Sequence, residues 1–365
     1  MKQVWHIIGS VSRTLLAFTF LFSGFVKAID PLGTVYKVED YFAAFGGLFN
    51  YLIPAALPIA LMLILLEFTL GWMLFTNVWT KVSSWLTLAF MLVMTPLTLY
   101  LALTNAVEDC GCFGDAVYLT NWQTFYKNVV LLVLVIILLL TKRYIPRTFL
   151  MTVEICLTLL AAGVAIGLMT YSLTHLPPLD FRPYKIGNNI PELMEVPEGA
   201  PADEYEVRFI YERDGEQKEF TLADYPKDDS TWTFVDQKSI LIKKGYEPPI
   251  HDFVVYDEEF EDITYDILEA EDVTLAILYK IEKAAPKQAA RLAQMAEKAA
   301  FNGRPFYLLT GSGDEEIEAF REQYQYDYPI CFCDGTALKT VVRANPGIVT
   351  LHYGTITDKY NLRNR

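Results

Sequence analysis

The length, composition and charge of the chain already exclude several classes of protein. It has 365 residues, 53% of them hydrophobic, and a formal net charge of −14 at pH 7. So large a hydrophobic share is not that of a soluble enzyme and indicates that part of the chain lies in lipid. The second half, residues 176–365, has a net charge of −15, which argues against nucleic acid as a partner and for a solvated domain.

Five apolar runs are long enough to be membrane helices, and the first is too long for a signal-peptide core and lacks a small-residue cleavage motif. The predicted spans are Val4–Ala28, Tyr51–Phe75, Ser83–Leu103, Phe125–Leu140 and Thr148–Leu173. A Pro/Gly break follows the first span, and the amphipathic stretch Val35–Phe45 is expected to lie at the membrane interface.

Two charged residues lie deep inside the predicted spans and away from their ends, Arg13 in the first and Glu67 in the second. A charge at that depth is costly and usually faces the bundle interior or reaches back to the head groups. We therefore expect Arg13 either to be functional or to anchor at the interface. An Arg13–Glu67 pair between adjacent helices would offset much of the burial cost of both charges.

The basic residues of the short loops predict the orientation of the bundle. If the helices alternate, one side receives Lys2, Lys81, Lys142, Arg143 and Arg147. The positive-inside rule assigns this side to the cytoplasm. The loop after the third span and the whole of residues 176–365 are then exported, into a compartment where disulfides form and persist.

The third and fourth spans are joined by a loop that contains Cys110-Gly111-Cys112. Glycine leaves the backbone free to close a small ring between the two sulfurs. A strained, exposed disulfide has a more oxidising potential than a relaxed one, so the pair is suited to electron exchange. A structural disulfide and half of a metal site remain the alternatives at this point.

A second Cys-x-Cys pair lies near the C-terminus, Cys331 and Cys333, and Cys156 stands alone in an apolar run. We expect Cys331 and Cys333 to relay electrons to Cys110 and Cys112, which requires contact through a mixed disulfide. The alternative is that both are buried strand thiols with a structural role.

The pattern changes after the fifth span. A Pro-rich linker leads into a β-rich module, residues 176–245, in which Asp214-Gly215 marks a hairpin. From Tyr246 strands and helices alternate, which is an α/β order. The predicted elements are strands at Val273–Tyr279 and Pro305–Leu309 and helices at Pro286–Phe301 and Asp314–Gln325.

Residues 1–141 resemble the DoxX-like membrane proteins, and within them the methylamine utilisation protein MauE family. The resemblance rests on the segment 21–27, on Asp30-Pro31 and above all on Cys110-Gly111-Cys112-Phe113-Gly114. It implies a four-helix membrane domain that helps to form disulfides in an exported partner, acting with a thioredoxin-like protein. The DoxX-like relatives imply thiosulfate or sulfur oxidation coupled to quinone instead.

Residues from about Tyr246 onward resemble periplasmic thioredoxin-like proteins related to peroxiredoxins. Residues 248–253 are similar to their entry strand, and Asn345-Pro346-Gly347 stands where that family has a turn with a cis-proline, Pro346. The family's Cys-x-x-Cys is missing, because the residues after Tyr279 read Lys280-Ile281-Glu282-Lys283. Its redox activity therefore does not carry over to that position.

These observations predict a membrane α-helical bundle of four DoxX/MauE-like helices (1–147) and a fifth helix (148–175), followed by the β-rich module and an exported thioredoxin-like domain (246–365) in the bacterial inner membrane. The predicted function is thiol–disulfide oxidoreduction with an exported thiol- or disulfide-bearing protein, with a quinone as possible cofactor. Acidic residues in the loop, Glu108, Asp109 and Asp115, are expected to oppose thiolate formation. The alternative is a non-catalytic, membrane-anchored scaffold whose cysteine-free face binds a client.

Overall fold

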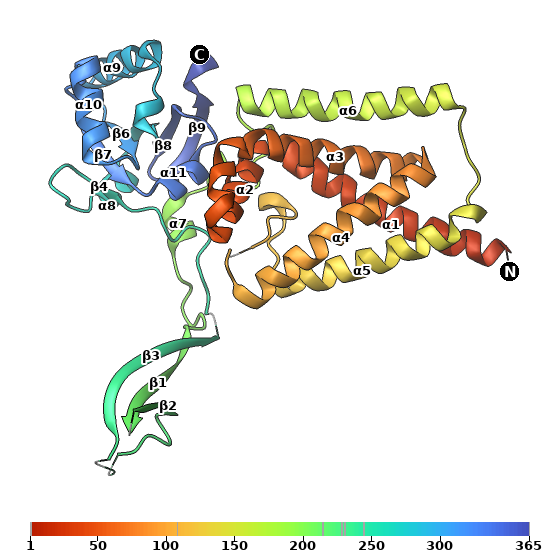
Figure 1. Cartoon of the computed structure of the whole chain (residues 1–365). Coiled ribbons are helices and arrows are strands. Elements are labelled where there is room, and N and C mark those ends of the chain that lie inside the picture. The colour runs from red at the N-terminus through yellow and green to blue at the C-terminus, as the bar shows by residue number, and fades with distance from the viewer. Residues whose placement is uncertain are drawn as a thin grey trace.

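The computed structural model describes residues 2–107, 109–213, 215–227, 229, 231–243 and 245–364. Glu108 and Asp214, both named above, lie outside the described residues. A bundle of long helices forms one part of the molecule, and an α/β domain and a three-stranded arm form the other (Figure 1).

The predicted membrane-spanning helices are confirmed. Five helical segments among the described residues are long and apolar enough to cross a bilayer. The long helices are α1 (Lys2–Ile29), α3 (Ala56–Thr76), α4 (Thr80–Thr104), α5 (Asn121–Thr141) and α6 (Met151–Thr174). The 3-10 segment η1 (Gly47–Ala55) leads into α3 and contains Pro54, which removes a backbone donor at this irregular entry.

Glycines let α1 and α3 approach closely. A Cβ added at Gly24 would lie 2.6 Å from the backbone nitrogen of Phe68, and one added at Gly71 would lie 2.5 Å from that of Leu21. Small residues at a helix crossing allow the close van der Waals packing on which helix association in lipid depends. The crossing also fixes the two helices that supply Lys27 and Glu67.

The predicted Arg13–Glu67 pair is wrong. Glu67 accepts from Lys27 Nζ at 2.7 Å, and both side chains are about nine-tenths buried. Arg13 instead donates to the carbonyl oxygens of Leu74 and Phe75 at the end of α3. Lys27 lies in the last turn of α1 and supplies the positive partner that a buried glutamate needs.

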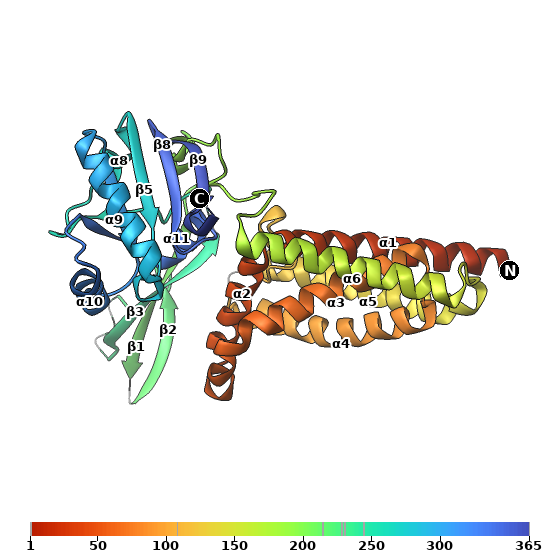
Figure 2. The same ribbon diagram turned by 90° about the horizontal axis from the view of Figure 1, so that it is seen from above.

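The two ends of the bundle differ in what they carry. The N-terminus, the α3–α4 turn and the α5–α6 connection lie at one end, and these segments hold the basic residues that the orientation argument used (Figures 1 and 2). At the other end lie α2 (Pro31–Phe45), the Cys110–Cys112 loop and the α/β domain. The basic residues of the short loops and the cysteine loop therefore lie at opposite ends of the bundle.

The C-terminal domain contains a six-stranded sheet in the order β4-β7-β6-β5-β8-β9. Strands β5, β6 and β7 are parallel, and β8 and β9 are antiparallel to their neighbours. The strands are β4 (Val255–Tyr256), β5 (Asp272–Ile277), β6 (Phe306–Thr310), β7 (Ile330–Cys333), β8 (Gly347–His352) and β9 (Thr355–Asn361).

Helices cover both faces of this sheet, and a separate hydrophobic core lies on each face. The helices α9 (Pro286–Phe301) and α10 (Asp314–Tyr324) pack on one face, and α8 (Thr264–Glu269) and α11 (Gly335–Val341) on the other. The peptide bond before Pro346 is cis, as the resemblance implied. The expected thioredoxin-like arrangement, with β5 leading to the position of the missing cysteines, is confirmed.

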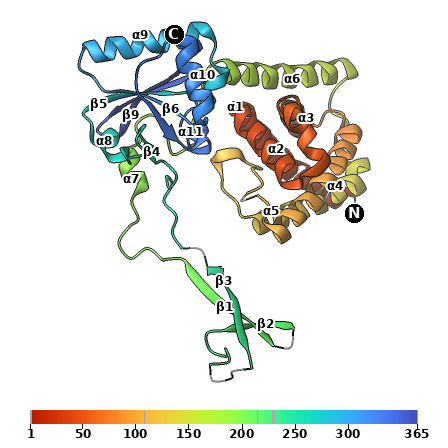
Figure 3. The ribbon, with the colours of Figure 1, turned by 60° about the vertical axis from the view of Figure 1, so that its left-hand side comes forward.

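The boundary between the β-rich module and the last domain differs from the prediction. Tyr184 and Ile190, the latter the first residue of α7 (Ile190–Met194), are buried in the core of the thioredoxin-like domain. The module itself is a separate antiparallel sheet of β1 (Glu204–Arg213), β2 (Glu216–Thr221) and β3 (Thr233–Lys243), which projects as an arm (Figure 3). The sequence between linker and module gave no strong periodicity, so burial of 180–194 could not be read from it.

We predict that Gly71→Ala destabilises the bundle by about 1–3 kcal/mol, the usual cost of overpacking, because the new methyl group would meet the backbone of α1. Gly167→Ala in α6 is the matched control, since a Cβ there meets nothing within 4 Å. The measurement is the thermal unfolding midpoint of the purified protein in detergent. Equal midpoints for the two variants would show that α1 and α3 do not cross at Gly71.

Candidate functional site

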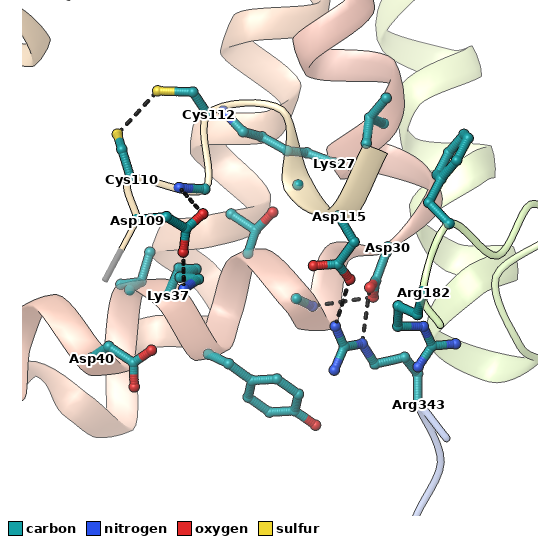
Figure 4. A pocket seen from close by; sticks show the side chains of 18 of the residues that line it. Lys27, Asp30, Lys37, Asp40, Asp109, Cys110, Cys112, Asp115, Arg182 and Arg343 are labelled. Atoms are coloured by element: carbon teal, nitrogen blue, oxygen red, sulfur yellow. Dashed lines mark hydrogen bonds and ion pairs between the residues drawn. The ribbon is translucent and has the colours of Figure 1, made fainter. Parts of the chain in front are cut away.

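A cavity of about 260 Å³ lies where the bundle meets the thioredoxin-like domain. Its walls come from the last turn of α1, from α2 and α3, from the Cys110–Cys112 loop and from the segment that follows α11 (Figure 4). Elements far apart in sequence thus meet around the cysteine loop, which agrees with the central place that the sequence analysis gave it.

The two loop cysteines are free thiols whose Sγ atoms are 3.0 Å apart. Gly111 between them has φ +62°, a left-handed conformation that favours glycine, and a Cβ there would lie 3.0 Å from the side chain of Lys37. Cys110 is buried, and Cys112 is partly exposed. The structure therefore brings the pair together and leaves Cys112 as the less buried of the two residues.

Hydrogen bonds hold the backbone of the loop on either side of Gly111. Tyr41 of α2 donates to the carbonyl oxygen of Cys110 at 2.6 Å, and Ser23 of α1 donates to that of Cys112. The Gly111 N–H donates to the carboxylate of Asp109 at 3.0 Å. Tyr41 and Ser23 belong to two different helices and Asp109 to the loop itself, so both the packing of the bundle and the loop's own sequence fix its backbone.

Charged pairs flank the thiols. Asp109 pairs with Lys37 of α2, and Asp115 accepts from Arg343 at 3.0 Å. Arg343 also pairs with Asp30 at 2.8 Å, and Asp30 caps the start of α2 by accepting from the Gly33 N–H. The two acidic residues of the loop that the structure describes are thus paired with cations.

The expectation that the acidic residues oppose thiolate formation is wrong for Cys112. A hydrogen bond from the Cys110 thiol, assisted by the positive charges of Lys127 and Lys27, lowers the pKa of Cys112 to about 6 although burial opposes the shift. The same hydrogen bond, together with burial, raises the pKa of Cys110 well above its usual range. In the reduced pair, Cys112 is therefore the thiolate, and it accepts a hydrogen bond from the thiol of Cys110.

Cys331 and Cys333 do not line this cavity. Both lie on β7 with 1% and 0% of their surface exposed, inside the core of the thioredoxin-like domain. Burial raises the pKa of each thiol to about 12. The structure thus favours the buried-thiol alternative over the relay, because exchange requires an accessible thiolate in contact with its partner.

The position of the missing Cys-x-x-Cys is occupied by the short 3-10 segment Ile281–Lys283. Just before it, the hydroxyl of Tyr279 lies 3.2 Å from that of Tyr36 in α2. Among the described residues no group of three or more His, Cys, Asp or Glu side chains is placed to hold a metal ion. The chemistry that these residues support at the cavity is thiol exchange at Cys110 and Cys112.

Sequence analysis missed Arg343, Lys27 and Lys37 as parts of the site. Lys27 lies at the end of the first predicted span, and Lys37 lies in the amphipathic stretch predicted at the membrane interface, two places where basic residues are ordinary. Arg343 stands three residues before Pro346 and has no local pattern of its own. A search for positive partners of Glu67 and Asp109 is the signal that would have found the lysines, whereas Arg343, the partner of Asp30 and Asp115, required the arrangement of the domains.

Two family profiles match the chain. Residues 5–141 match the methylamine utilisation protein MauE family, and residues 205–244 match a domain of unknown function (DUF8463). No curated protein matches the chain. The first match covers α1 to α5 and includes the cysteine loop, and the second covers the projecting arm.

Two solved structures resemble the C-terminal part. A putative protein disulfide isomerase from Bacteroides thetaiotaomicron is 16% identical, with a TM-score of 0.27, and the match covers 31% of this chain and 77% of that one. The thioredoxin domain of a thiol-disulfide oxidoreductase from Bacteroides vulgatus is 13% identical, with a TM-score of 0.25, over 29% and 81%.

We predict that alkylation of Cys112 by iodoacetamide is half-maximal near pH 6 in the reduced protein, because only the thiolate reacts. Cys110→Ala removes the hydrogen-bond donor, so the midpoint should move upward toward the value of an ordinary cysteine. Mass spectrometry of the labelled peptides, with Cys331 and Cys333 as unreactive internal controls, gives the profile. A wild-type midpoint above pH 8 would contradict the assignment of Cys112 as the thiolate.

Proposed function

Because residues 5–141 form a MauE-family membrane domain, we propose that this chain is a thiol–disulfide redox protein of the bacterial inner membrane that exchanges disulfides with an exported partner. The observation that carries the proposal is the pair of free thiols 3.0 Å apart in a loop outside the helices. The different pKa values of its two members suit one to attack and the other to hold the proton.

The exchange that the site supports passes through Cys112. Its thiolate attacks one sulfur of the partner's disulfide, forms a mixed disulfide and releases the partner's other sulfur as a thiolate, which takes up a proton. Cys110 then loses its proton, attacks the Sγ of Cys112 and frees the partner's second thiol. Two electrons pass to the partner, and the Cys110–Cys112 disulfide remains.

The same steps in reverse oxidise a dithiol partner, and the mixed disulfide again forms at Cys112. The burial of Cys110 supports this choice in both directions, since a partner's sulfur reaches Cys112 more readily. The partner is thus an exported protein that carries a reactive dithiol or disulfide.

A membrane quinone is the proposed second redox partner. The cavity that holds the thiols extends over an apolar wall of Val26, Leu63, Phe90 and Met94, which suits a quinone ring. Lys27 would be the hydrogen-bond donor to a quinone oxygen, since its ammonium has donors beyond the one that Glu67 uses. When bound, a quinone would take two electrons and two protons from the dithiol.

The proposed orientation follows from the charges at the two ends of the bundle. The end with Lys2, Lys81 and the cluster 142–147 faces the cytoplasm, and the cysteine loop and residues 176–365 face the periplasm. We expect alkaline phosphatase fused after the C-terminus to be active and a cytosolic reporter at the same place to be silent. The opposite result would contradict the orientation.

The rival function is a membrane-anchored scaffold that binds a client without exchanging electrons. The absence of Cys-x-x-Cys after Tyr279 supports it. The contact of that face with α2, through Tyr36 and Tyr279, argues against the scaffold, because a client would have to displace the bundle to reach the face.

We predict that Cys110→Ser traps the exported partner as a mixed disulfide with Cys112, because the thiol that resolves the intermediate is gone. Cys112→Ser should trap little, since Cys110 is buried and its pKa is raised. Non-reducing gels of membranes quenched with acid show the adduct, and Cys331→Ser in the Cys110→Ser background is the matched control. No adduct in any of these variants would favour the scaffold.

A further inference from the structure

Arg343 is a deeply buried cation at the junction of the two domains. Its side chain is 6% exposed, and it bridges Asp30, at the start of α2, and Asp115, in the cysteine loop. A third donor of the guanidinium goes to the carbonyl oxygen of Lys339 in its own domain. An arginine can serve all three acceptors at once because its donors are arranged as a rigid planar fork.

The surroundings of Arg343 show that the contact is more than a surface ion pair. Its guanidinium lies 5.4 Å from the ring centroid of Tyr36, and Lys339 lies over the same ring at 4.9 Å. Tyr36 in turn meets Tyr279 at the end of β5. The guanidinium of Arg343 and the carboxylate of Asp30 are both largely buried, so this pair is strongly coupled. The side chain of Asp115 is 43% exposed, so its pair with Arg343 is coupled less strongly.

This contact uses the face of the thioredoxin-like domain that would carry Cys-x-x-Cys in the family it resembles. Tyr279 immediately precedes the vacant position at 280–283, and Arg343 lies three residues before the cis-proline Pro346. The face without cysteines is thus applied to the membrane domain of the same chain, close to the cysteines that the membrane domain does possess.

The contact leaves the sulfurs free. In Figure 4 Arg343 reaches Asp115 and Asp30 from one side of the loop, and the Sγ atoms of Cys110 and Cys112 lie on the opposite side. Asp109 and Lys37 hold the other end of the same loop. Arg343 therefore contacts the loop on the side opposite to the two sulfurs.

We propose that the thioredoxin-like domain acts in cis as a clamp on the redox loop, with Arg343 as the positioning residue that fixes Asp115 and, through the loop, the geometry of Cys110 and Cys112. This role rests on the proposed thiol–disulfide function. The loop is short and has glycines at both 111 and 114 with positive φ, so it needs external anchors to keep the sulfurs in hydrogen-bond contact.

The test compares the full-length protein with Arg343→Gln, Arg343→Lys and Asp115→Asn in detergent. Each variant is reduced and reacted with 5,5′-dithiobis(2-nitrobenzoic acid), and the rate at Cys112 is measured as a function of pH. We expect Arg343→Gln to slow exchange about tenfold at pH 7, the scale on which small displacements of a reacting group affect rates, and to raise the pH midpoint.

Arg343→Lys should recover part of the rate, because it keeps the charge but not the fork, and Asp115→Asn should resemble Arg343→Gln. Asp30→Asn separates the two roles of Asp30, since asparagine still caps α2, and should have an intermediate effect. Arg321→Gln is the matched control, because it removes an arginine ion pair to Glu258 elsewhere in the same domain, and should leave rate and midpoint unchanged.

The outcomes separate this inference from the proposed function. A wild-type pair that exchanges, together with Arg343→Gln and Asp115→Asn variants that keep the wild-type rate and pH midpoint, would overturn the clamp alone. A variant that fails to fold is recognised by its thermal midpoint, and Arg343→Lys and Asp115→Asn then decide the question. A wild-type Cys112 that does not react at all would overturn the proposed function first.

Discussion

Buried charges that are paired across different elements hold this molecule together where the bundle meets the thioredoxin-like domain. Lys27 and Glu67 join α1 to α3, Lys37 joins α2 to the cysteine loop, and Arg343 joins the last domain to both α2 and the loop. Lys27 and Glu67 are both about nine-tenths buried, so removing either one is expected to cost about 3–5 kcal/mol, because the other charge is left without compensation. Lys37 and Asp115 are about one-third and two-fifths exposed, so their pairs contribute less. Each pair therefore constrains two segments at once, and together they enclose the dithiol.

These pairs also set the chemistry of the loop. Acidic residues beside a thiol would hold its proton if they stood alone, but Asp109 and Asp115 are matched by cations. The hydrogen bond from Cys110 then dominates, and the pKa of Cys112 falls to about 6. A low pKa makes the thiolate abundant near neutral pH while keeping one thiol protonated, which is the asymmetry that a two-step exchange requires.

Much of the architecture could be predicted from the sequence, because hydropathy over twenty residues and the Cys-Gly-Cys spacing are local signals. The five spans and the order of the α/β elements were predicted in this way, with ends that differ by a few residues. The partner of Glu67 could not be predicted, since Arg13 and Lys27 both lie on α1 and both contact α3, and only the packing at Gly24 and Gly71 decides which of them lies level with Glu67. The role of Arg343 could not be predicted either, because its ion pairs form only where the two domains meet.

The degenerate thioredoxin-like domain illustrates why a fold does not carry its usual activity with it. Its own cysteines, Cys331 and Cys333, are buried on β7 and have raised pKa values. What remains of the usual active face lies against α2 through Tyr279 and Arg343. A domain that has no thiol pair at its active position can thus support the thiol pair of its neighbour.

The most direct test of the central claim is the redox state of each cysteine in intact membranes, trapped by acid and alkylation with and without added quinone. The account predicts that Cys110 and Cys112 shift together from thiols to a disulfide when quinone is added, while Cys331 and Cys333 stay reduced and become reactive only after denaturation. Cys110 and Cys112 that keep one redox state under both conditions, or a shift confined to Cys331 and Cys333, would contradict it.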